Sequence, residues 1–449
     1  MFEKYEAVLN QVDPIKYSGV VQKVQGLIIE SLGPQVVVGE LCHIFVPRGD
    51  GMIRAEVVGF NNEIVQLMPF DDMEGIEPGC TVVAMGEYLT IPVSEKLLGR
   101  VLNSMGHPMD EKGSIGSSES FSVRNTPPDV LKRKSITKRL ITGVRAIDAL
   151  TPIGMGQRVG IFSGSGVGKS TLLGMVARNT HADINVIALI GERGREVKEF
   201  LESDLGKEGL ARSVVIVSTS DTPPLSRVRA AFVATAVAEY FRDQGKNVML
   251  LFDSITRFAR AQREIGLAVG EPPATRGFTP SVFSLLPKLL ERCGTSEKGT
   301  ITGFYTILVD GDDMDEPVAD NVRGILDGHI ILSRKLAQSY HYPAIDILQS
   351  LSRLGNKITT SEEQAAMGRI RTLLAGYTDA EDLINVGAYA EGSNKTIDEA
   401  IEKIELIRNF LQQRVEENAD IVKTLALAEE ISGIKIPLKK EPPNEAVSI

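Results

Sequence analysis

The chain has 449 residues, 43% of them hydrophobic, which predicts a globular protein of about three domains. Its 59 acidic and 49 basic residues give a formal net charge of −10, which argues against sequence-independent wrapping of nucleic acid as the main activity. Three cysteines without Cys-x-x-Cys spacing indicate neither a disulfide framework nor a zinc site, and no apolar run approaches the roughly 20 residues that span a bilayer. We therefore expect a cytoplasmic protein that acts at a membrane only through partners.

Residues 1–16 predict an amphipathic helix. Apolar side chains recur there at helical spacing until Pro14 ends the pattern. Two interpretations remain open: a frayed terminus that packs on its own domain, and a helix that docks on a partner. The apolar residues of this pattern are Phe2, Tyr5, Leu9 and Val12.

Residues 17–90 predict a small β-barrel domain, because short β-rich runs such as 36–38 and 56–60 alternate with turn signals. Residues 91–355 form the predicted nucleotide-binding domain, in which strand-like and helical stretches alternate from residue 159 onward and predict a mostly parallel sheet covered by helices. Residues 356–449 predict a helical domain. Its last clear helix has an apolar stripe and an expected capping box formed by Thr396 and Glu399.

A phosphate-binding loop follows the apolar run 159–162 and precedes the helix-like stretch 172–178. Its glycines let several N–H groups point at one anion beside the positive end of the helix. In the Walker A pattern Lys169 reaches the β- and γ-phosphates and Ser170 ligates Mg²⁺. The first glycine of that pattern is replaced by Ser163, which fits with a negative φ and would be strained with a positive one. The predicted nucleotide-binding residues are Ser163, Gly164, Ser165, Gly166, Val167, Gly168, Lys169, Ser170 and Thr171.

Two carboxylates follow predicted strands of the same sheet. Asp253 ends the apolar run 248–252, where a Walker B carboxylate would face Mg²⁺ at the carboxyl edge of the sheet. Glu192 follows the strand 184–190, and we expect it to polarise the attacking water. Glu196 and Glu202 compete for that role, since a loop can present any of them.

Two arginines lie after the same strands. Arg193 and Arg257 are the predicted contacts of the γ-phosphate in the transition state, with surface salt bridges as the alternative. Together with the lysine, the metal ligands and the activating carboxylate, they complete the groups that phosphoryl transfer to water requires.

Several segments together resemble the catalytic family of rotary ATP synthases and type III export ATPases. Besides the Walker A loop they are GERGREV (191–197), LLFDSITRFARAQRE (250–264) and YPAIDILQSLSR (342–353). The resemblance runs from about residue 17 to the C-terminus. Within the family, residues 270–292 are most similar to the flagellar export members, and the acidic lever typical of the synthase β-subunit is absent from the C-terminal region.

The resemblance implies a RecA-like core that assembles as a homohexamer, with each nucleotide at a subunit boundary. It implies that Glu192 is the catalytic carboxylate, that Lys169 and Ser170 bind phosphate and Mg²⁺, and that Arg193 and Arg257 sense the γ-phosphate. Tyr342 would stack on adenine, and Arg353 would be the arginine finger that enters the neighbouring site. Ordinary core packing remains the alternative for Tyr342, and a structural ion pair for Arg353.

The activity implied is MgATP hydrolysis that drives the unfolding or delivery of flagellar subunits at a membrane export gate. The implied partners are a stator-like regulator on residues 1–16, a coiled-coil stalk held in the pore by the loop 266–277, the gate, and exported proteins with their chaperones. The chain would be cytoplasmic and peripheral at the inner face of the bacterial membrane.

The rivals are an injectisome ATPase, a synthase β-type subunit, a nucleotide-binding scaffold without turnover, and the hexameric helicase that terminates transcription. Scaffold subunits tend to lose the Walker lysine or the catalytic glutamate, and this chain keeps both. The helicase would interleave basic and aromatic residues in its barrel. Residues 17–90 have few aromatics and at least as many acids as bases, so no nucleic-acid partner is expected.

Overall fold

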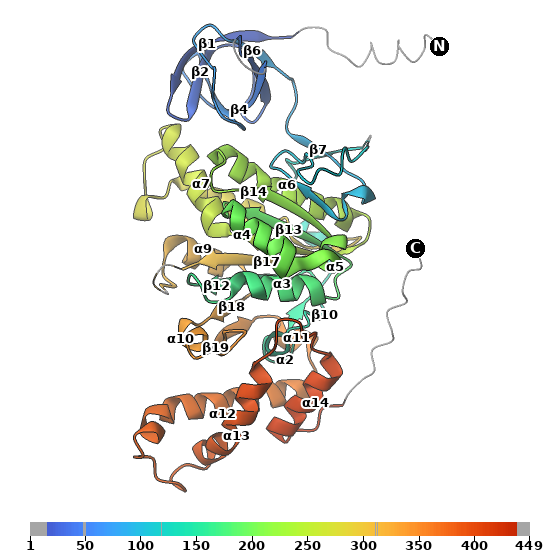
Figure 1. Ribbon diagram of the computed structural model, residues 1–449, viewed down its shortest axis with the longest axis vertical. Helices are drawn as coiled ribbons and strands as arrows, with labels where there is room; N and C mark the ends of the chain where they lie inside the picture. The colour runs from blue at the N-terminus through green and yellow to red at the C-terminus, as the bar shows by residue number, and fades with distance from the viewer. Residues whose placement is uncertain (1–15, 48–50, 118, 310, 312, 438–449) are drawn as a thin grey trace, which may run out of the picture.

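The computed structural model describes residues 16–47, 51–117, 119–309, 311 and 313–437. Along the long axis of the molecule, a β-barrel lies at one end, an α/β core in the middle and a group of helices at the other end (Figure 1). This architecture confirms the predicted fold class. The helix predicted for residues 1–16 lies outside the described residues, apart from Lys16. Among the described helices, none combines the length and apolar character needed to cross a membrane.

The barrel is closed by strands in the order β1-β2-β5-β4-β3-β6. Side chains alternate between its interior and solvent, as the two-residue period of a strand requires. Val21, Ile29, Ile44 and Leu67 are among the residues that fill the interior. The strands are β1 Ser18–Gln25, β2 Ile28–Leu32, β3 Leu41–Phe45, β4 Met52–Asn61, β5 Ile64–Pro69 and β6 Thr81–Ala84.

The core is built on a sheet in the order β19-β18-β12-β17-β15-β13-β14-β8, with β16 paired to β17. From β18 to β8 the strands along this order are parallel, while β19 and β16 are antiparallel to their neighbours. The strands are β8 Arg100–Leu102, β12 Arg158–Ser163, β13 Ile184–Ile190, β14 Ser213–Ser218, β15 Asn247–Asp253, β16 Gly294–Thr295, β17 Thr300–Leu308, β18 Gly328–Leu332 and β19 Ile345–Ser352.

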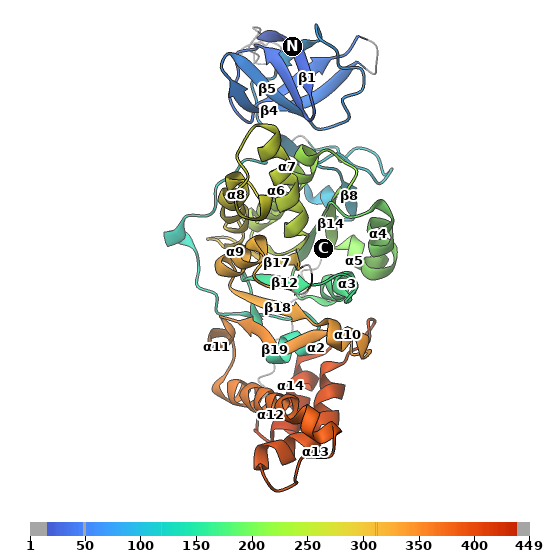
Figure 2. The same cartoon turned by 90° about the vertical axis from the view of Figure 1, so that its left-hand side faces the viewer.

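Helices cover both faces of the sheet, so its central strands β13 and β14 are buried along their whole length (Figure 2). One face carries α6 Pro224–Asp243, α7 Ile255–Ala268, α8 Pro280–Leu290 and α9 Pro317–Ile325. The other face carries α2 Arg145–Leu150, α3 Lys169–Asn179, α4 Gly194–Glu199, a π-helix at Phe200–Leu205 and α5 Gly206–Ala211. Shorter elements complete the core: β7 Thr90–Pro92, β9 Ser120–Ser122, β10 Arg139–Leu140, β11 Ile153–Gly154 and α10 Arg334–Gln338.

The C-terminal region consists of α11 Gly355–Ile358, α12 Ser361–Asn385, α13 Lys395–Leu411 and α14 Ile421–Ser432. Arg371 of α12 joins these helices to the core. Its guanidinium donates hydrogen bonds to the backbone carbonyls of Ile347 (2.5 Å) and Ser350 (3.1 Å) in β19, and of Leu150 (2.8 Å) in α2.

The capping box expected from Thr396 and Glu399 is wrong. The side chain of Asn394 caps α13 instead, by accepting hydrogen bonds from the backbone N–H groups of Thr396 and Ile397. Because Asn394 already satisfies these donors, the helix begins at Lys395, and Glu399 is free to pair with Lys403 (3.0 Å) and with Arg369.

Candidate functional site

The phosphate-binding loop joins the end of β12 to the start of α3. Gly166 and Gly168 have φ angles of 76° and 87°, a left-handed conformation in which any side chain would be strained. Ser163 is the last residue of β12 and is not among the described non-glycine residues with positive φ, so serine is accommodated there without backbone strain. The loop therefore turns its backbone toward the N-terminus of α3, where an anion is favoured.

Lys169 brings the loop together with both predicted carboxylates. Its Nζ lies 2.5 Å from Oδ1 of Asp253 and 3.3 Å from Oε1 of Glu192. The three residues come from the start of α3 and the ends of β15 and β13, which meet because parallel strands end at the same edge of a sheet. Ser170, Glu192 and Asp253 line one small pocket there.

Glu192 is the buried acid of this cluster. Burial raises its pKa to about 7, with a further contribution from the negative charge of Asp253, while Lys169 and Arg257 oppose the shift. Arg257 lies 2.5 Å from Oε2 of Glu192 and also donates a hydrogen bond to the carbonyl of Gly191 (2.6 Å). A carboxyl group that is held in place and titrates near neutral pH can accept a proton at physiological pH.

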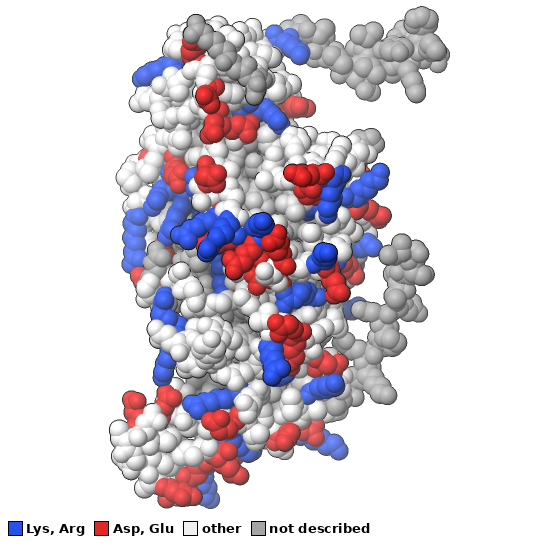
Figure 3. All heavy atoms as spheres, in the orientation of Figure 1, with Lys and Arg blue, Asp and Glu red and all other residues white. Residues whose placement is uncertain are grey.

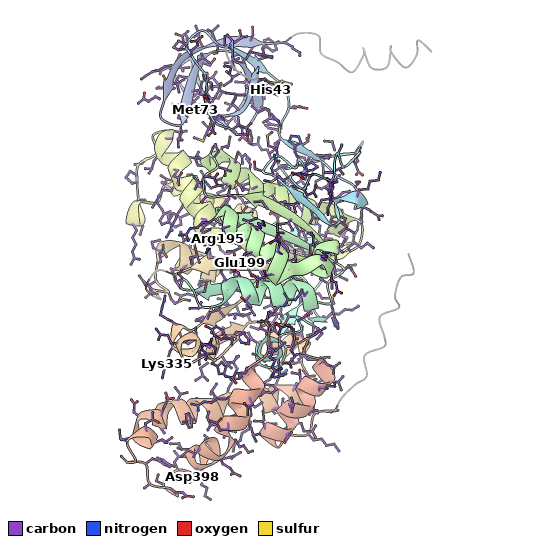
Figure 4. All side chains as sticks on the ribbon, in the orientation of Figure 1. His43, Met73, Arg195, Glu199, Lys335 and Asp398 are labelled. Atoms are coloured by element: carbon purple, nitrogen blue, oxygen red, sulfur yellow. The ribbon has the colours of Figure 1, made fainter. Side chains whose placement is uncertain are left out.

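The rival carboxylates lie differently. Glu196 shares a hydrogen bond with Glu192, which lowers the pKa of Glu196, and it lines the same pocket. Glu202 has a side chain 67% exposed and lies 3.8 Å from Lys198 on the outer surface. Figure 3 shows acidic and basic side chains next to one another over the core, and Figure 4 shows Arg195 and Glu199 on α4, at the same face of the molecule. Of the three acids, Glu202 is the one that lies apart from Lys169.

The two candidate arginines also differ in exposure and in their partners. The side chain of Arg257 is 25% exposed and contacts Glu192, so it belongs to the cluster. The side chain of Arg193 is 77% exposed and lies 3.1 Å from Glu196. The structure therefore brings Arg257 into the site and leaves Arg193 at its outer rim.

Tyr342 lies against the phosphate-binding loop, although it is far from it in sequence. A Cβ atom built on Gly168 would be 3.4 Å from the Tyr342 ring. The ring is 38% exposed and forms an edge-to-face pair with Tyr340, with centroids 6.0 Å apart. A ring that borders the loop and keeps an open face is suited to stack on a flat ligand.

Arg353 lies at the opposite edge of the sheet. It follows β19, where Ser352 pairs with Gly328, the residue beside the start of β12. The phosphate-binding loop follows the far end of β12, about 16 Å away at ~3.3 Å per residue. The side chain of Arg353 is exposed and forms no ion pair within the described part of the chain. The structure thus does not bring Arg353 to Lys169 of its own chain.

Sequence reasoning missed one contact of the cluster. Oγ1 of Thr306 lies 2.8 Å from Oδ1 of Asp253, and Thr306 is fully buried in β17. The available signal was a hydroxyl in a strand expected to be buried, but Thr302 gives the same signal, and the partner of Thr306 depends on the register between β17 and β15.

Comparisons with known proteins match each part of the chain to one family. Residues 143–352 match the ATP synthase alpha/beta family, nucleotide-binding domain, and residues 21–86 match the β-barrel domain of that family. Residues 359–428 match the T3SS EscN ATPase C-terminal domain.

Full-length relatives narrow the assignment. The chain is 55% identical to the flagellum-specific ATP synthase of Treponema pallidum, over 96% of this chain and 97% of that protein. It is 52% identical to the flagellum-specific ATP synthase of Bacillus subtilis, over 95% and 97%. It is 50% identical to the type 3 secretion system ATPase of Xanthomonas euvesicatoria, over 91% and 92%.

Solved structures agree. The assembled ATPase EscN of the enteropathogenic E. coli type III secretion system superposes with a TM-score of 0.88 at 45% identity, covering 92% of this chain and 100% of EscN. EscN in complex with its central stalk EscO gives a TM-score of 0.86 at the same identity and coverage. With barrel, core and helical region all matched, the chain belongs to the flagellum-specific ATP synthases of the ATP synthase alpha/beta family and is an ATPase of flagellar type III export.

Proposed function

We propose that the chain binds MgATP at the phosphate-binding loop and hydrolyses it with Glu192 as the catalytic carboxylate. The observation that carries this proposal is the meeting of Lys169, Glu192 and Asp253 at one edge of the sheet. The ammonium of Lys169 forms ion pairs with both carboxylates. The phosphates of ATP would take over as its partners, since they offer the same charge-assisted hydrogen bonds.

The residues of the pocket fit Mg²⁺. The hydroxyl of Ser170 and the carboxylate of Asp253 are the oxygen ligands this ion prefers, and an ATPase site needs only one or two of them besides the phosphates. When bound, Mg²⁺ neutralises negative charge on the phosphates. Glu192 would orient the attacking water and accept its proton at Oε1, and Arg257 would keep the carboxylate in position through Oε2.

The site would be completed by a second copy of the chain. Arg353 is exposed at the edge opposite the loop, so its guanidinium can reach a nucleotide only on a neighbouring molecule. There it would stabilise the charge of the transferred phosphoryl group as an arginine finger. A closed ring gives every site one such arginine, which supports a homohexamer; the related EscN was solved in an assembled form.

In the cell, hydrolysis would be coupled to unfolding or delivering flagellar proteins, with their chaperones, at the membrane export gate. The EscN complex with the central stalk EscO supports a coiled-coil stalk in the pore of the ring. The proposed contact with that stalk is the segment 266–277, which begins as the last turn of α7 and continues as a loop whose residues 272–276 are exposed. Gly270 and Arg276 have positive φ angles in this segment. A stator-like regulator on residues 1–16 would hold the enzyme in the cytoplasm at the inner face of the membrane.

The test compares Glu192→Gln with Glu202→Gln. We expect Glu192→Gln to lower the hydrolysis rate about 10²- to 10⁴-fold, because the base is lost, while equilibrium binding of a fluorescent ATP analogue is retained. Glu202→Gln should keep the wild-type rate, since its side chain lies on the outer surface. A wild-type rate of phosphate release in Glu192→Gln would show that another group activates the water.

A further inference from the structure

Thr306 contacts Asp253 and has no role in the function described so far. It lies on β17, one position beyond the pairing of Phe252 with Tyr305, which sets it beside Asp253 on the neighbouring strand. Its side chain is fully buried. The hydroxyl has two possible acceptors, Oδ1 of Asp253 at 2.8 Å and the carbonyl of Phe252 at 3.2 Å.

The hydroxyl proton can serve only one of these acceptors at a time. The carboxylate oxygen is both nearer and charged, so it is the stronger acceptor. Valine has the same shape as threonine and suits a buried strand better, because it brings no polar atom that needs a partner. The hydrogen bond that its hydroxyl donates to Asp253 therefore explains why threonine occupies this position.

Among the residues that the structure describes, Oδ1 of Asp253 has two partners, Thr306 and Lys169. Within the described residues, Oδ2 receives no hydrogen bond from the protein. Lys169 is also the residue that must turn to the phosphates when ATP binds. After it does so, Thr306 is the remaining side chain that holds Oδ1 and thereby fixes the rotation of the carboxylate.

We propose that Thr306 is a positioning residue of the ATPase site, whose hydroxyl holds Oδ1 of Asp253 and so keeps Oδ2 available for the nucleotide-bound cation. This inference rests on the proposed role of Asp253 in holding Mg²⁺. It assigns Thr306 to the affinity for the cation and not to the affinity for the nucleotide itself. Serine at this position would preserve the role, and valine would abolish it.

Thr302 provides a matched control on the same strand. It is also buried, at 2% exposure, and its hydroxyl accepts a hydrogen bond from the backbone N–H of Gly156 (2.8 Å). Gly156 precedes β12, at the edge away from the phosphate-binding loop. Thr302→Val removes a buried hydroxyl from the same sheet without touching Asp253.

The experiment measures binding of a fluorescent, non-hydrolysable ATP analogue to the full chain as Mg²⁺ is titrated, and again in excess EDTA. Thr306→Val should need about tenfold more Mg²⁺ for half-maximal binding, a typical effect of losing a group that orients a metal ligand. Its binding in EDTA should equal that of wild type. Thr306→Ser and Thr302→Val should both keep the wild-type Mg²⁺ requirement.

Hydrolysis provides a second readout. The rate of Thr306→Val should fall at limiting Mg²⁺ and recover at saturating Mg²⁺, which a misfolded site would not do. An unchanged Mg²⁺ requirement in Thr306→Val would overturn the inference, and so would an equal loss of binding in EDTA. Asp253→Asn separates the two proposals. If Asp253→Asn leaves the Mg²⁺ requirement unchanged, the proposed role of Asp253 fails. If Asp253→Asn raises the Mg²⁺ requirement and Thr306→Val does not, only the role of Thr306 is rejected.

Discussion

The two edges of the core sheet differ in how completely their charges are paired. At the carboxyl edge, Lys169, Glu192 and Asp253 form a buried network whose members neutralise one another. At the opposite edge, Arg353 is exposed and forms no ion pair within the described residues, although the nearby Arg158 pairs with Asp327 and Glu291. Under the proposed function, one chain would hold the phosphates with its own carboxyl edge, and its exposed Arg353 would serve the nucleotide site of a second copy.

Mixing two inactive variants, one altered at each edge of the sheet, is the strongest test of whether two copies of the chain share a site. Arg353→Ala should lower the hydrolysis rate about 10³-fold, the usual contribution of an arginine finger, without changing the fold. Lys169→Ala should be inactive because it loses the phosphate contact. A mixture of the two should regain activity at boundaries where one copy supplies Lys169 and the other supplies Arg353, measured as phosphate release against the mixing ratio.

Three outcomes would contradict the two-edge arrangement. One is a mixture no more active than its components. Another is an Arg353→Ala variant as active as wild type. The third is wild-type specific activity that is independent of protein concentration, because a site shared between copies requires association.

Tyr342 sharpens the description of the carboxyl edge. Tyr342→Ala should raise KM for ATP about tenfold with little change in kcat, because stacking on a base contributes to binding and not to the transition state. Tyr340→Ala is the matched control, since Tyr340 pairs with Tyr342 but is 85% exposed. Steady-state kinetics of both variants would show whether Tyr342 stacks on the base. Equal increases in KM for Tyr342→Ala and Tyr340→Ala would mean instead that the two rings together stabilise the phosphate-binding loop.

The pH dependence of stability tests how strongly the carboxyl edge is buried. The pKa of Glu192 is raised to about 7 in the folded protein, from an ordinary value of 4.5. The stability that its protonated form contributes is thus complete below pH 4.5 and is lost as the pH rises through 7. Glutamine cannot ionise, so Glu192→Gln does not lose this stability. Its free energy of unfolding should therefore rise relative to that of wild type by on the order of 1 kcal/mol when the pH is raised from 5 to 8.

Denaturant unfolding of the nucleotide-free protein at both pH values measures this difference. Glu202→Gln should show no such gain, because its carboxylate is exposed. An advantage of Glu192→Gln that is the same at pH 5 and at pH 8 would mean that Glu192 is not the titrating group.

The fold and the centre of the site were predictable from local patterns. Asp253 ends an apolar strand and Lys169 and Glu192 follow two others. Because parallel strands end at one edge of a sheet, the meeting of these three residues was predictable from sequence. The sequence could not distinguish Glu192 from Glu202, because that choice depends on how α4 and the following π-helix turn away from the sheet.

Contacts that depend on three-dimensional packing were beyond sequence reasoning. Thr306 contacts Asp253 through the register of β17 against β15, which no single segment encodes. The cap of α13 is another case, because Asn394 and Thr396 are both acceptable caps by residue type, and the preceding chain decides between them. Conversely, Arg353 was predicted to be an arginine finger from the family resemblance alone. It lies at the edge of the sheet away from the phosphate-binding loop, so the sequence around it does not indicate which residues it contacts.

The guanidinium of Arg371 has a mechanical consequence. It fastens α12 to the backbone carbonyls of β19 and α2, so the long helix and the edge strand cannot slide past each other without breaking several hydrogen bonds at once. β19 ends one residue before Arg353. A displacement of α12 is therefore transmitted to β19 and to the residue that follows it, Arg353. Under the proposed function, this connection would couple the helical end of one chain to the nucleotide site of its neighbour.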